Sequence, residues 1–444
     1  MKNFLVFTRP FTDTFTKYYS RDDCNIDYIS DFKFFGDLDV MSFIYENFEN
    51  TSEEEVFDEL IYSEIIMRDR YLRYIELNIA KKLINSAWKY VVHVLSAKSY
   101  DGYIGAPVDN YIQHLIVKAC YKFNVKAISP VHSPLPYRAR VTNLGEYIKV
   151  RDANMSEVVE MYEILNNKDF KPIWLSKNRT TAKILKMYLK ERVKKIVFKF
   201  LKLKNSDPYS FHYNCIYPMK GAITIHSLDV LRVKKMYVGN LNKIQEKAKK
   251  FRKVAYLVLQ FNPEASINYL ISDSKFSQYD LLMEKIMDNT PDDTLILVKE
   301  HPDIYGYRRP DFYKKFQNRK NVMLVDVATP TSVMFDLADY LFVTGSSSTG
   351  IEGVIKDKTV ISFGGAFYGH NNNYVHQIKA FDEICNLRKH LVTIKLTKND
   401  KLAFLKTILD NTLPINYEGL VRSTKKNHDA NVKATQAILD FMNK

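Results

Sequence analysis

Polar residues at the end of one apolar segment have the types and spacing to bind a phosphorylated ligand. The segment TLILVKE ends in Lys299 and Glu300, and His301 and Pro302 follow. Because proline cannot extend the hydrogen-bond ladder of a strand, His301 is expected at a strand tip. Its imidazole could donate to a phosphate oxygen while Lys299 adds positive charge. A solvated histidine at a capped strand end is the alternative interpretation.

A second set of candidate residues leads from the segment YLFVTG into a helical pattern. Small residues let the backbone approach a ligand closely, and the amides at a helix start attract anions. Glu352 is predicted in the first helical turn, where it suits the helix dipole and could accept from ribose hydroxyls. An ordinary serine-rich cap is the alternative, and without GK[ST] the sequence is not a Walker A loop. The candidate ligands are Gly345, Ser346, Ser347, Ser348, Thr349 and Glu352.

Two further apolar segments end in similar turns. LQFNPEAS places Gln260 and Glu264 just beyond a predicted strand. TVISFGGAFYG brings Tyr368 after a glycine pair, where its ring could meet a base or a sugar. Glycine turns after strands also occur for packing reasons alone.

The elements that must position these residues are apolar runs of strand length separated by helix-like segments. This pattern is typical of buried parallel strands joined by crossovers. In such a doubly wound sheet, ligands bind beyond the carboxyl ends of the strands, so the polar turns share one edge. Strands are predicted at 254–260, 294–300, 322–326, 340–345 and 359–364.

The first half of the chain also alternates between strand-like and helix-like segments, as an α/β unit requires. Strands are predicted at 3–8 and 125–129, and helices at about 52–96 and at 111–123. Near the predicted strand ends lie four candidates for a general base, each of which could instead be structural or solvated. They are Asp101, Asp109, His114 and His132.

Length and composition predict a folded protein of two domains. A chain of 444 residues exceeds one ordinary core, and 46% of its residues are hydrophobic. We expect domains at 1–215 and 216–420, and a helix at 421–444 that could cross back to the first domain. Four cysteines without CxxC spacing argue against a zinc site and a disulfide framework. No apolar run is long enough for a membrane-spanning helix, so a cytoplasmic protein is expected.

The net charge of +14 favours acidic partners. Residues 181–204 alternate basic and apolar residues near helical spacing, which predicts a basic amphipathic helix. This helix could contact an anionic membrane surface, which would make the protein peripheral at the inner face of the plasma membrane, or pack on its own domain with a solvated basic face. The charge does not indicate a nucleic-acid partner, because the sequence has no RNP-like or helix-turn-helix signature.

In their order along the chain, these turns resemble those of a known protein family. LQFNPEAS, VKEHP, Arg308 or Arg309, VTGSSSTGIEG and ISFGGAFYG closely resemble the C-terminal half of capsule polysaccharide biosynthesis proteins, a group that includes bacterial capsule Kdo transferases. The resemblance covers roughly residues 254–370. It implies an α/β fold of the GT-B class, in which two Rossmann-like doubly wound domains face each other across a cleft.

The resemblance also implies an activity. In related CMP-sugar transferases an HP pair and a serine-rich turn bind the cytidine nucleotide, and here these correspond to His301 and Pro302 and to Ser346, Ser347 and Ser348. The expected protein is a glycosyltransferase that moves a sugar from a nucleotide-activated donor, with CMP favoured, to a capsular or lipid-linked glycan. The first domain would hold the acceptor and supply the base, from Asp101, Asp109 or His132.

Neither a metal nor a cofactor besides the donor is expected. The second half has no DxD pair placed after a strand, since Asp292 and Asp293 precede one. Two other functions stay open. One is a CDP-glycerol-type polyol phosphotransferase, which combines similar motifs, and the other is a non-catalytic partner in capsule assembly or export.

Overall fold

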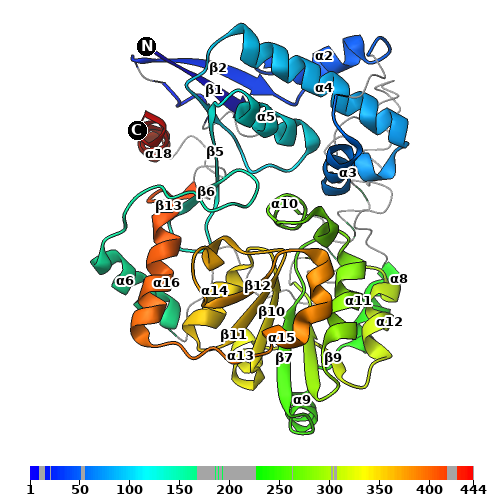
Figure 1. The fold of residues 1–444 in the computed structure, drawn as a ribbon. Helices are drawn as coiled ribbons and strands as arrows, with labels where there is room; N and C mark the ends of the chain where they lie inside the picture. The colour runs from blue at the N-terminus through cyan, green and yellow to red at the C-terminus, as the bar shows by residue number, and fades with distance from the viewer. Residues whose placement is uncertain are drawn as a thin grey trace. The chain divides into compact units, whose positions relative to one another are not determined.

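The computed structural model divides into two compact units (Figure 1). Unit 1 comprises Met1–Asn154 and Thr407–Lys444, and unit 2 comprises Met155–Lys406. The predicted boundary near 215 lies outside the described residues, as does most of the predicted basic helix at 181–204. The described residues are 1–9, 16–20, 22–51, 56–167, 186, 189, 193, 227–262, 264–301, 304, 308–417 and 428–443.

Unit 1 is built on a seven-stranded sheet with the order β13-β6-β5-β4-β1-β2-β3. The strands from β5 to β3 in this order are parallel, while β6 pairs antiparallel with both β5 and β13. From β1 the chain goes first to β2 and later to β4 on its other side, so the crossover direction reverses there. The strands are β1 Lys2–Thr8, β2 Cys24–Ser30, β3 Leu38–Asp39, β4 Gly102–Ile104, β5 Lys126–His132, β6 Ala139–Thr142 and β13 Thr412–Leu413.

Three helices of unit 1 start at side-chain caps. Asp39, Asp58 and Asn110 each accept a backbone N–H from the first turn of the helix that follows. The C-terminal helix packs Ile438 and Met442 into the same core as Phe4. The helices are α2 Val40–Asn47, α3 Glu59–Arg68, η1 Leu72–Tyr74, α4 Leu77–Ala97, α5 Tyr111–Lys122 and α18 His428–Asn443.

Unit 2 contains a parallel six-stranded sheet with the order β12-β11-β10-β7-β8-β9. Here the crossover direction reverses between β7 and β10. Apart from the edge strand β12, these strands are near-continuous apolar runs, as expected for strands buried on both faces. They are β7 Lys253–Val258, β8 Thr294–Lys299, β9 Val322–Val325, β10 Tyr340–Thr344, β11 Thr359–Phe363 and β12 Val375–Ile378.

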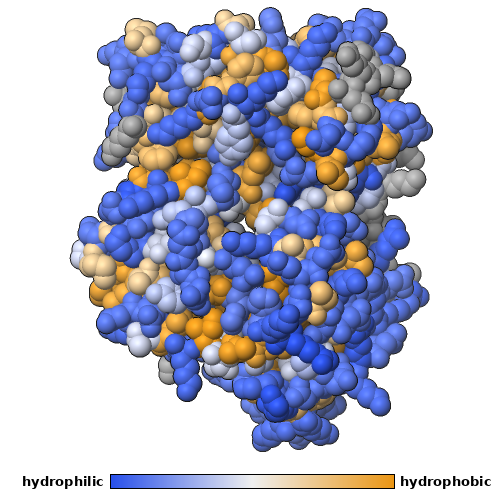
Figure 2. All heavy atoms as spheres, viewed as in Figure 1, coloured by the Kyte–Doolittle hydropathy of each residue, from blue (hydrophilic) through white to orange (hydrophobic). Residues whose placement is uncertain are grey.

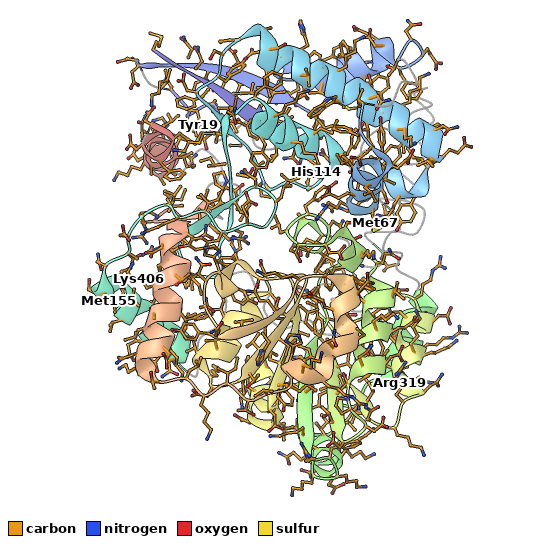
Figure 3. All side chains as sticks on the ribbon, viewed as in Figure 1. Tyr19, Met67, His114, Met155, Arg319 and Lys406 are labelled. Atoms are coloured by element: carbon orange, nitrogen blue, oxygen red, sulfur yellow. The ribbon has the colours of Figure 1, made fainter. Side chains whose placement is uncertain are left out.

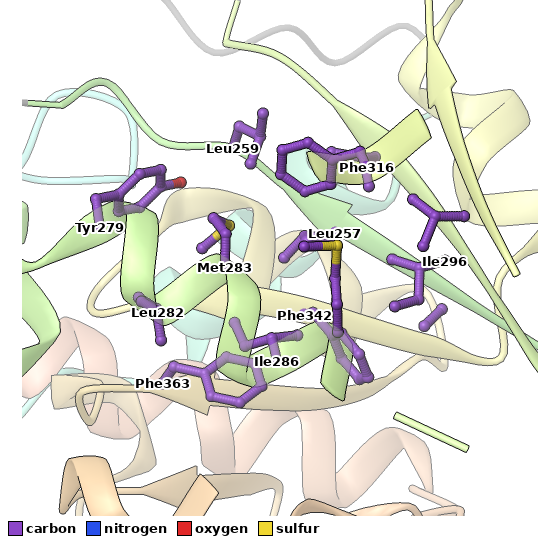
Figure 4. Packing of buried hydrophobic residues seen from close by; sticks show 14 of the residues in the cluster. Leu257, Leu259, Tyr279, Leu282, Met283, Ile286, Ile296, Phe316, Phe342 and Phe363 are labelled. Carbon is purple, nitrogen blue, oxygen red and sulfur yellow. The ribbon is translucent and has the colours of Figure 1, made fainter. Parts of the chain in front are cut away.

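Helices cover the sheet of unit 2. Figure 4 shows Met283 and Ile286 of α11 beside Leu257, Phe342 and Phe363 of the strands, all in one buried cluster. Helix α16 carries the chain from unit 2 into unit 1. The helices are α6 Met155–Asn166, α8 Ser227–Met236, α9 Leu241–Ala248, α10 Ala265–Asn268, η3 Ser274–Ser277, α11 Tyr279–Asn289, α12 Pro310–Gln317, α13 Thr331–Leu337, α14 Ser348–Ile355, η4 Phe367–Gly369, η5 Phe381–Asn386, α15 Leu387–His390 and α16 Lys398–Asp410.

The predicted α/β class, with two Rossmann-like doubly wound units as in GT-B proteins, is confirmed. The helical pattern predicted from about 52 to 96 is found in α3 and α4, and η1 breaks it between them, while residues 52–55 lie outside the described residues. The carboxylate of Asp69 explains the break. It accepts the backbone N–H groups of Tyr71 and Leu72, which gives the backbone there an alternative to helical hydrogen bonds.

Candidate donor-binding site

The candidate site begins where β7 and β10 end side by side. The amide Nε2 of Gln260 donates to Oγ of Ser347 at 2.9 Å, which joins the turns that follow the two strands. Between β10 and Ser347, Gly345 has a φ of +53°, and a Cβ there would lie 3.3 Å from the backbone oxygen of Ser266. Glycine tolerates both the left-handed backbone and the close approach. The fold therefore brings Gln260 and Ser347, two of the predicted ligands, together.

Two polar atoms in these turns are buried without a partner among the described residues. They are Oγ of Ser346 and Oδ1 of Asn262. Ser347 is the N-cap of α14 by position, yet its side chain makes no capping hydrogen bond. Half-buried Ser348 and Thr349 form the first turn of this helix. Because buried polar atoms and uncapped helix amides need hydrogen-bond partners, the arrangement suits an anionic ligand.

The end of β8 is held by a buried ion pair. The carboxylate of Glu300 accepts from Nε of Arg308 at 2.8 Å, from the hydroxyl of Tyr313 at 2.6 Å and from the backbone N–H of His301 at 2.8 Å. Arg308 also donates to the backbone oxygen of Gln260 at 2.5 Å. Burial alone would lower the pKa of Arg308, but the neighbouring Glu300 raises it above the usual value. The pair thus fixes the tips of β7 and β8 together.

His301 lies at the predicted strand tip, half-buried and edge-to-face with Phe261 at 5.9 Å between ring centres. Lys299 does not lie at the surface of the turn, contrary to the role predicted for it. Its ammonium group is buried and donates to the backbone oxygen of Thr329 at 2.6 Å and to Oγ1 of Thr331 at 3.1 Å. Burial lowers the pKa of Lys299 to about 8. Lys299 therefore ties β8 to the loop after β9.

Two more predicted ligands have different positions from those expected. Glu352 is the fifth residue of α14, so the prediction that it lies in the first turn is wrong. Burial raises its pKa to about 7. The ring of Tyr368 is fully buried, and its hydroxyl donates to the backbone oxygen of Ser347 at 3.1 Å. A Cβ at Gly350 would lie 2.1 Å from that hydroxyl, so Tyr368 supports the serine turn from within the unit.

The remaining predicted ligands contribute less to the geometry. Glu264 is exposed and accepts from Oγ of Ser266 at 2.8 Å. Pro302 lies outside the described residues. Of the two arginines in the motif, Arg309 is exposed, while the side chain of Arg308 is only 7% exposed. The choice that the sequence left open is resolved in favour of Arg308 as the buried member.

Unit 1 has its own charged cluster at the carboxyl edge of its sheet. Arg9 follows β1, Asp31 follows β2 and Asp109 comes after β4. Nη2 of Arg9 lies 2.5 Å from Oδ2 of Asp31 and 2.8 Å from Oδ1 of Asp109. The Asp31 side chain is fully buried, whereas that of Asp109 is 16% exposed. Arg70 adds a donor to the backbone oxygen of Asp109 at 3.3 Å. Asp109 is thus the member that reaches solvent.

The other base candidates have different surroundings. Asp101 precedes β4 at the opposite edge of the sheet, and its Oδ2 accepts from the backbone N–H of Asn3 at 2.8 Å. His132 is exposed at the end of β5. His114, labelled in Figure 3, is buried within α5, and burial lowers its pKa well below the usual value. Of the four predicted bases, Asp109 is the one that forms an ion pair with Arg9.

Sequence reasoning did not select Glu300, Tyr313, Arg9 or Asp31 as functional residues. Glu300 stands inside VKEHP, so its place beside His301 was a usable signal. No such signal marks Arg9 in the sequence, because its partner Asp109 lies 100 residues away.

Comparison with known proteins confirms the resemblance found in the sequence. The family described as "Capsule polysaccharide biosynthesis protein" matches residues 163–371. No curated protein is similar enough in sequence to count as a match. Among solved structures, a beta Kdo 2,4 transferase, KpsC of Thermosulfurimonas dismutans, is 12% identical with a TM-score of 0.34, over 70% of this chain and 80% of its own.

Two other solved structures show how distant these likenesses are. UDP-GlcNAc 2-epimerase of Methanocaldococcus jannaschii, in complex with UDP-GlcNAc and UDP, is 11% identical with a TM-score of 0.27, over 92% of this chain and 98% of its own. Anabaena Alr3699/HepE, in complex with UDP-glucose, is 9% identical with a TM-score of 0.25, over 100% of both chains. At these TM-scores the likenesses carry no inference about this chain.

Two features are absent from the described part of the chain. No helix in it is both long enough and apolar enough to span a membrane. No group of three or more His, Cys, Asp and Glu side chains in it is arranged to hold a metal ion.

Proposed function

Because residues 163–371 match the family of capsule polysaccharide biosynthesis proteins, we propose that this protein is a glycosyltransferase of capsule assembly. It transfers a sugar from a nucleotide-activated donor to a capsular or other bacterial surface glycan. The donor binds to unit 2 at the carboxyl edge of the sheet, where β7 and β10 end, and a CMP-sugar is the favoured donor.

The observation that carries this proposal is the pair of buried atoms without a partner, Oγ of Ser346 and Oδ1 of Asn262. They lie in the turns joined by the bond between Gln260 and Ser347. An unpaired buried polar atom costs on the order of 1–3 kcal/mol, which a ligand hydroxyl or phosphate can recover. Strand ends at a crossover reversal are also where doubly wound sheets bind nucleotides.

The chemistry follows from the charge that develops on the leaving nucleotide. The uncapped start of α14 at Ser348 and Thr349 directs its amides to a phosphate, and His301 supplies a further donor from β8. Fixed donors of this kind stabilise negative charge without reorganisation. We propose that they act without a metal ion, so that transfer persists in excess EDTA.

The acceptor is proposed to bind to unit 1, with Asp109 as the general base. Of the candidates it is the one that joins strand ends of a single edge and keeps part of its carboxylate exposed. Arg9 fixes its orientation. Peripheral contact with an anionic membrane through residues 181–204 belongs to the same proposal, and its support is the sequence pattern alone.

The test is replacement of His301 by Ala, with His93→Ala as the matched control because His93 is exposed on α4. Purified proteins are offered CMP-, UDP-, GDP- and CDP-activated donors, with and without EDTA. Donor-induced thermal stabilisation and product formation are then measured. We expect His301→Ala to lose at least about tenfold in donor affinity or turnover, roughly one charge-assisted hydrogen bond, and the control to match wild type.

The outcomes separate the alternatives. Release of CMP with sugar transfer supports the proposal, whereas transfer of a polyol phosphate from a CDP-activated donor identifies the phosphotransferase. No turnover with any donor and no stabilisation by one would favour a non-catalytic assembly partner. Wild-type turnover in folded His301→Ala would remove His301 from the site.

A further inference from the structure

A basic hollow lies at the edge of unit 2 opposite to the proposed donor site. Its volume is 410 Å³, and it lies between α9, the turn before β7 and the start of β9. Because all strands of this sheet are parallel, their amino ends share this edge, while His301 and Ser347 follow carboxyl ends. In Figure 2 this end of the molecule is covered largely by hydrophilic residues. We call it the lysine hollow, formed by Lys243, Lys247, Lys250 and Lys320 with Phe251 and Met323.

The charges of the lysine hollow are not balanced by the protein. Glu246 is the acidic residue in its lining, against four lysines. Within the described part of the chain, none of these four ammonium groups forms an ion pair. Burial and the positive charge of Lys250 lower the pKa of Lys247. The lysines therefore repel one another across the hollow.

Neighbouring basic residues of the same unit behave differently. Nζ of Lys253 lies 2.8 Å from Oδ1 of Asp339, and Nζ of Lys315 lies 2.6 Å from Oε1 of Glu284. Nη2 of Arg319 lies 2.5 Å from Oδ1 of Asp288. These three basic side chains are paired, whereas the four lysines of the hollow form no ion pair within the described residues. An excess of converging positive charge around a concave surface is the pattern expected of an anion site.

We propose that the lysine hollow is a binding site for a phosphate-bearing anion, separate from the donor site. Several point charges without a fixed fork suit phosphate, which carries more than one negative charge and accepts from many directions. Half-buried Phe251 and Met323 provide an apolar floor for the ester carbon that bears the phosphate. Lys247 is anchored, since its Nζ donates to the backbone oxygen of Val322 at 3.0 Å, while the other three lysines are exposed and free to converge on the ligand.

The phosphate has two possible sources, a soluble molecule or the headgroup of an anionic lipid. The test uses pyrophosphate in titration calorimetry for the first and co-sedimentation with phosphatidylglycerol vesicles for the second, with phosphatidylcholine vesicles as the neutral reference. The variant replaces Lys243, Lys250 and Lys320 by Gln and keeps Lys247. The matched control removes the same charge from exposed lysines elsewhere on unit 2, namely Lys285, Lys389 and Lys395.

We expect the wild type and the control to bind at least one of the two probes. The hollow variant should lose at least about tenfold in affinity for it, in a salt-dependent manner. The binding that the hollow variant loses should persist in His301→Ala, which separates the lysine hollow from the donor site. Loss of pyrophosphate binding identifies a soluble ligand, and loss of vesicle binding alone identifies a lipid headgroup. Equal binding by the hollow variant and the control, or no binding by wild type, would overturn the proposal.

Discussion

The carboxyl edges of the two sheets both place a buried arginine behind the strand tips, but they present different groups to a ligand. In unit 1, Arg9 lies between Asp31 and Asp109, and part of Asp109 remains exposed. In unit 2, Arg308 is paired with Glu300, whose side chain is fully buried. One edge thus offers a carboxylate, whereas the other encloses its charges.

This difference matches two kinds of chemistry. A partly exposed carboxylate held by an arginine, such as that of Asp109, can accept a hydrogen bond from a hydroxyl group, as an acceptor sugar would supply. The edge of unit 2 instead offers donors and hydroxyls, including Ser346 and the start of α14, which suit a phosphate. Under the proposed function, similar buried arginines would support different ligands, because Asp109 is partly exposed in unit 1 and Glu300 is buried in unit 2.

The largest expected effect is the loss of Arg9. Replacing it by Met leaves Asp31 and Asp109 close together and buried without their shared cation, which costs about 3–5 kcal/mol of unfolding free energy. Denaturant unfolding would measure it. The control is Arg252→Met, because the side chain of Arg252 is 78% exposed and should contribute no more than about 1 kcal/mol. A loss below about 1 kcal/mol in Arg9→Met would show that the cluster does not need its arginine.

The second prediction uses two neighbouring arginines of unit 2. Arg308→Met leaves Glu300 uncompensated and removes the donor to Gln260, whereas Arg309→Met alters an exposed side chain. We expect Arg308→Met to lose about 2–4 kcal/mol of stability and at least about tenfold in donor affinity, with Arg309→Met near wild type.

A double variant sharpens this test. Adding Glu300→Gln to Arg308→Met removes the uncompensated charge, so part of the lost stability should return. Donor affinity should stay low, because Gln260 still lacks its arginine. If stability and affinity recover together, the pair contributes to the fold alone.

Five of the six strands of unit 2 were predictable from the sequence, because each is a largely apolar run of strand length. The edge strand β12 was not predicted, since His376 and Gln377 interrupt its apolar residues. The position of the serine turn was predictable as well, because its small residues directly follow such an apolar run, although the same residues also suit an ordinary helix cap. The direction of individual side chains was not. Lys299 points into the unit and Glu352 lies one turn deeper than expected, and both follow from tertiary packing that spacing does not encode.

Partners far apart in the sequence were also beyond prediction. Arg308 reaches the backbone of Gln260, 48 residues earlier, and the ring centres of Tyr279 and Phe312 lie 4.9 and 4.8 Å from its guanidinium carbon. In unit 1, the predicted first strand appears, but β2 and α2 form in a region for which no element was predicted. Mixed polar and apolar residues such as those of β2 are hard to assign without the neighbouring strand.

The smallest expected effect concerns the support beneath the serine turn. Tyr368→Phe keeps the buried ring next to Gly350 and removes the hydroxyl that donates to the backbone oxygen of Ser347. Since a neutral hydrogen bond contributes about 1 kcal/mol, stability should fall by that amount. The turn should also become less well positioned, so the KM for the donor should rise by a few-fold while kcat changes little.

Tyr340→Phe is the matched control for this last prediction. It removes a tyrosine hydroxyl that donates to a backbone oxygen, that of Leu391 at 2.9 Å, at the start of β10 and thus at the opposite edge of the sheet. Both variants should lose similar stability, because the bonds are alike, yet only Tyr368→Phe should raise the KM. If the two variants have the same KM as wild type, Tyr368 holds the fold and does not position the donor-binding turn. In that case the edge of unit 2 would depend on the pair of Arg308 and Glu300 for its geometry, as the edge of unit 1 depends on Arg9.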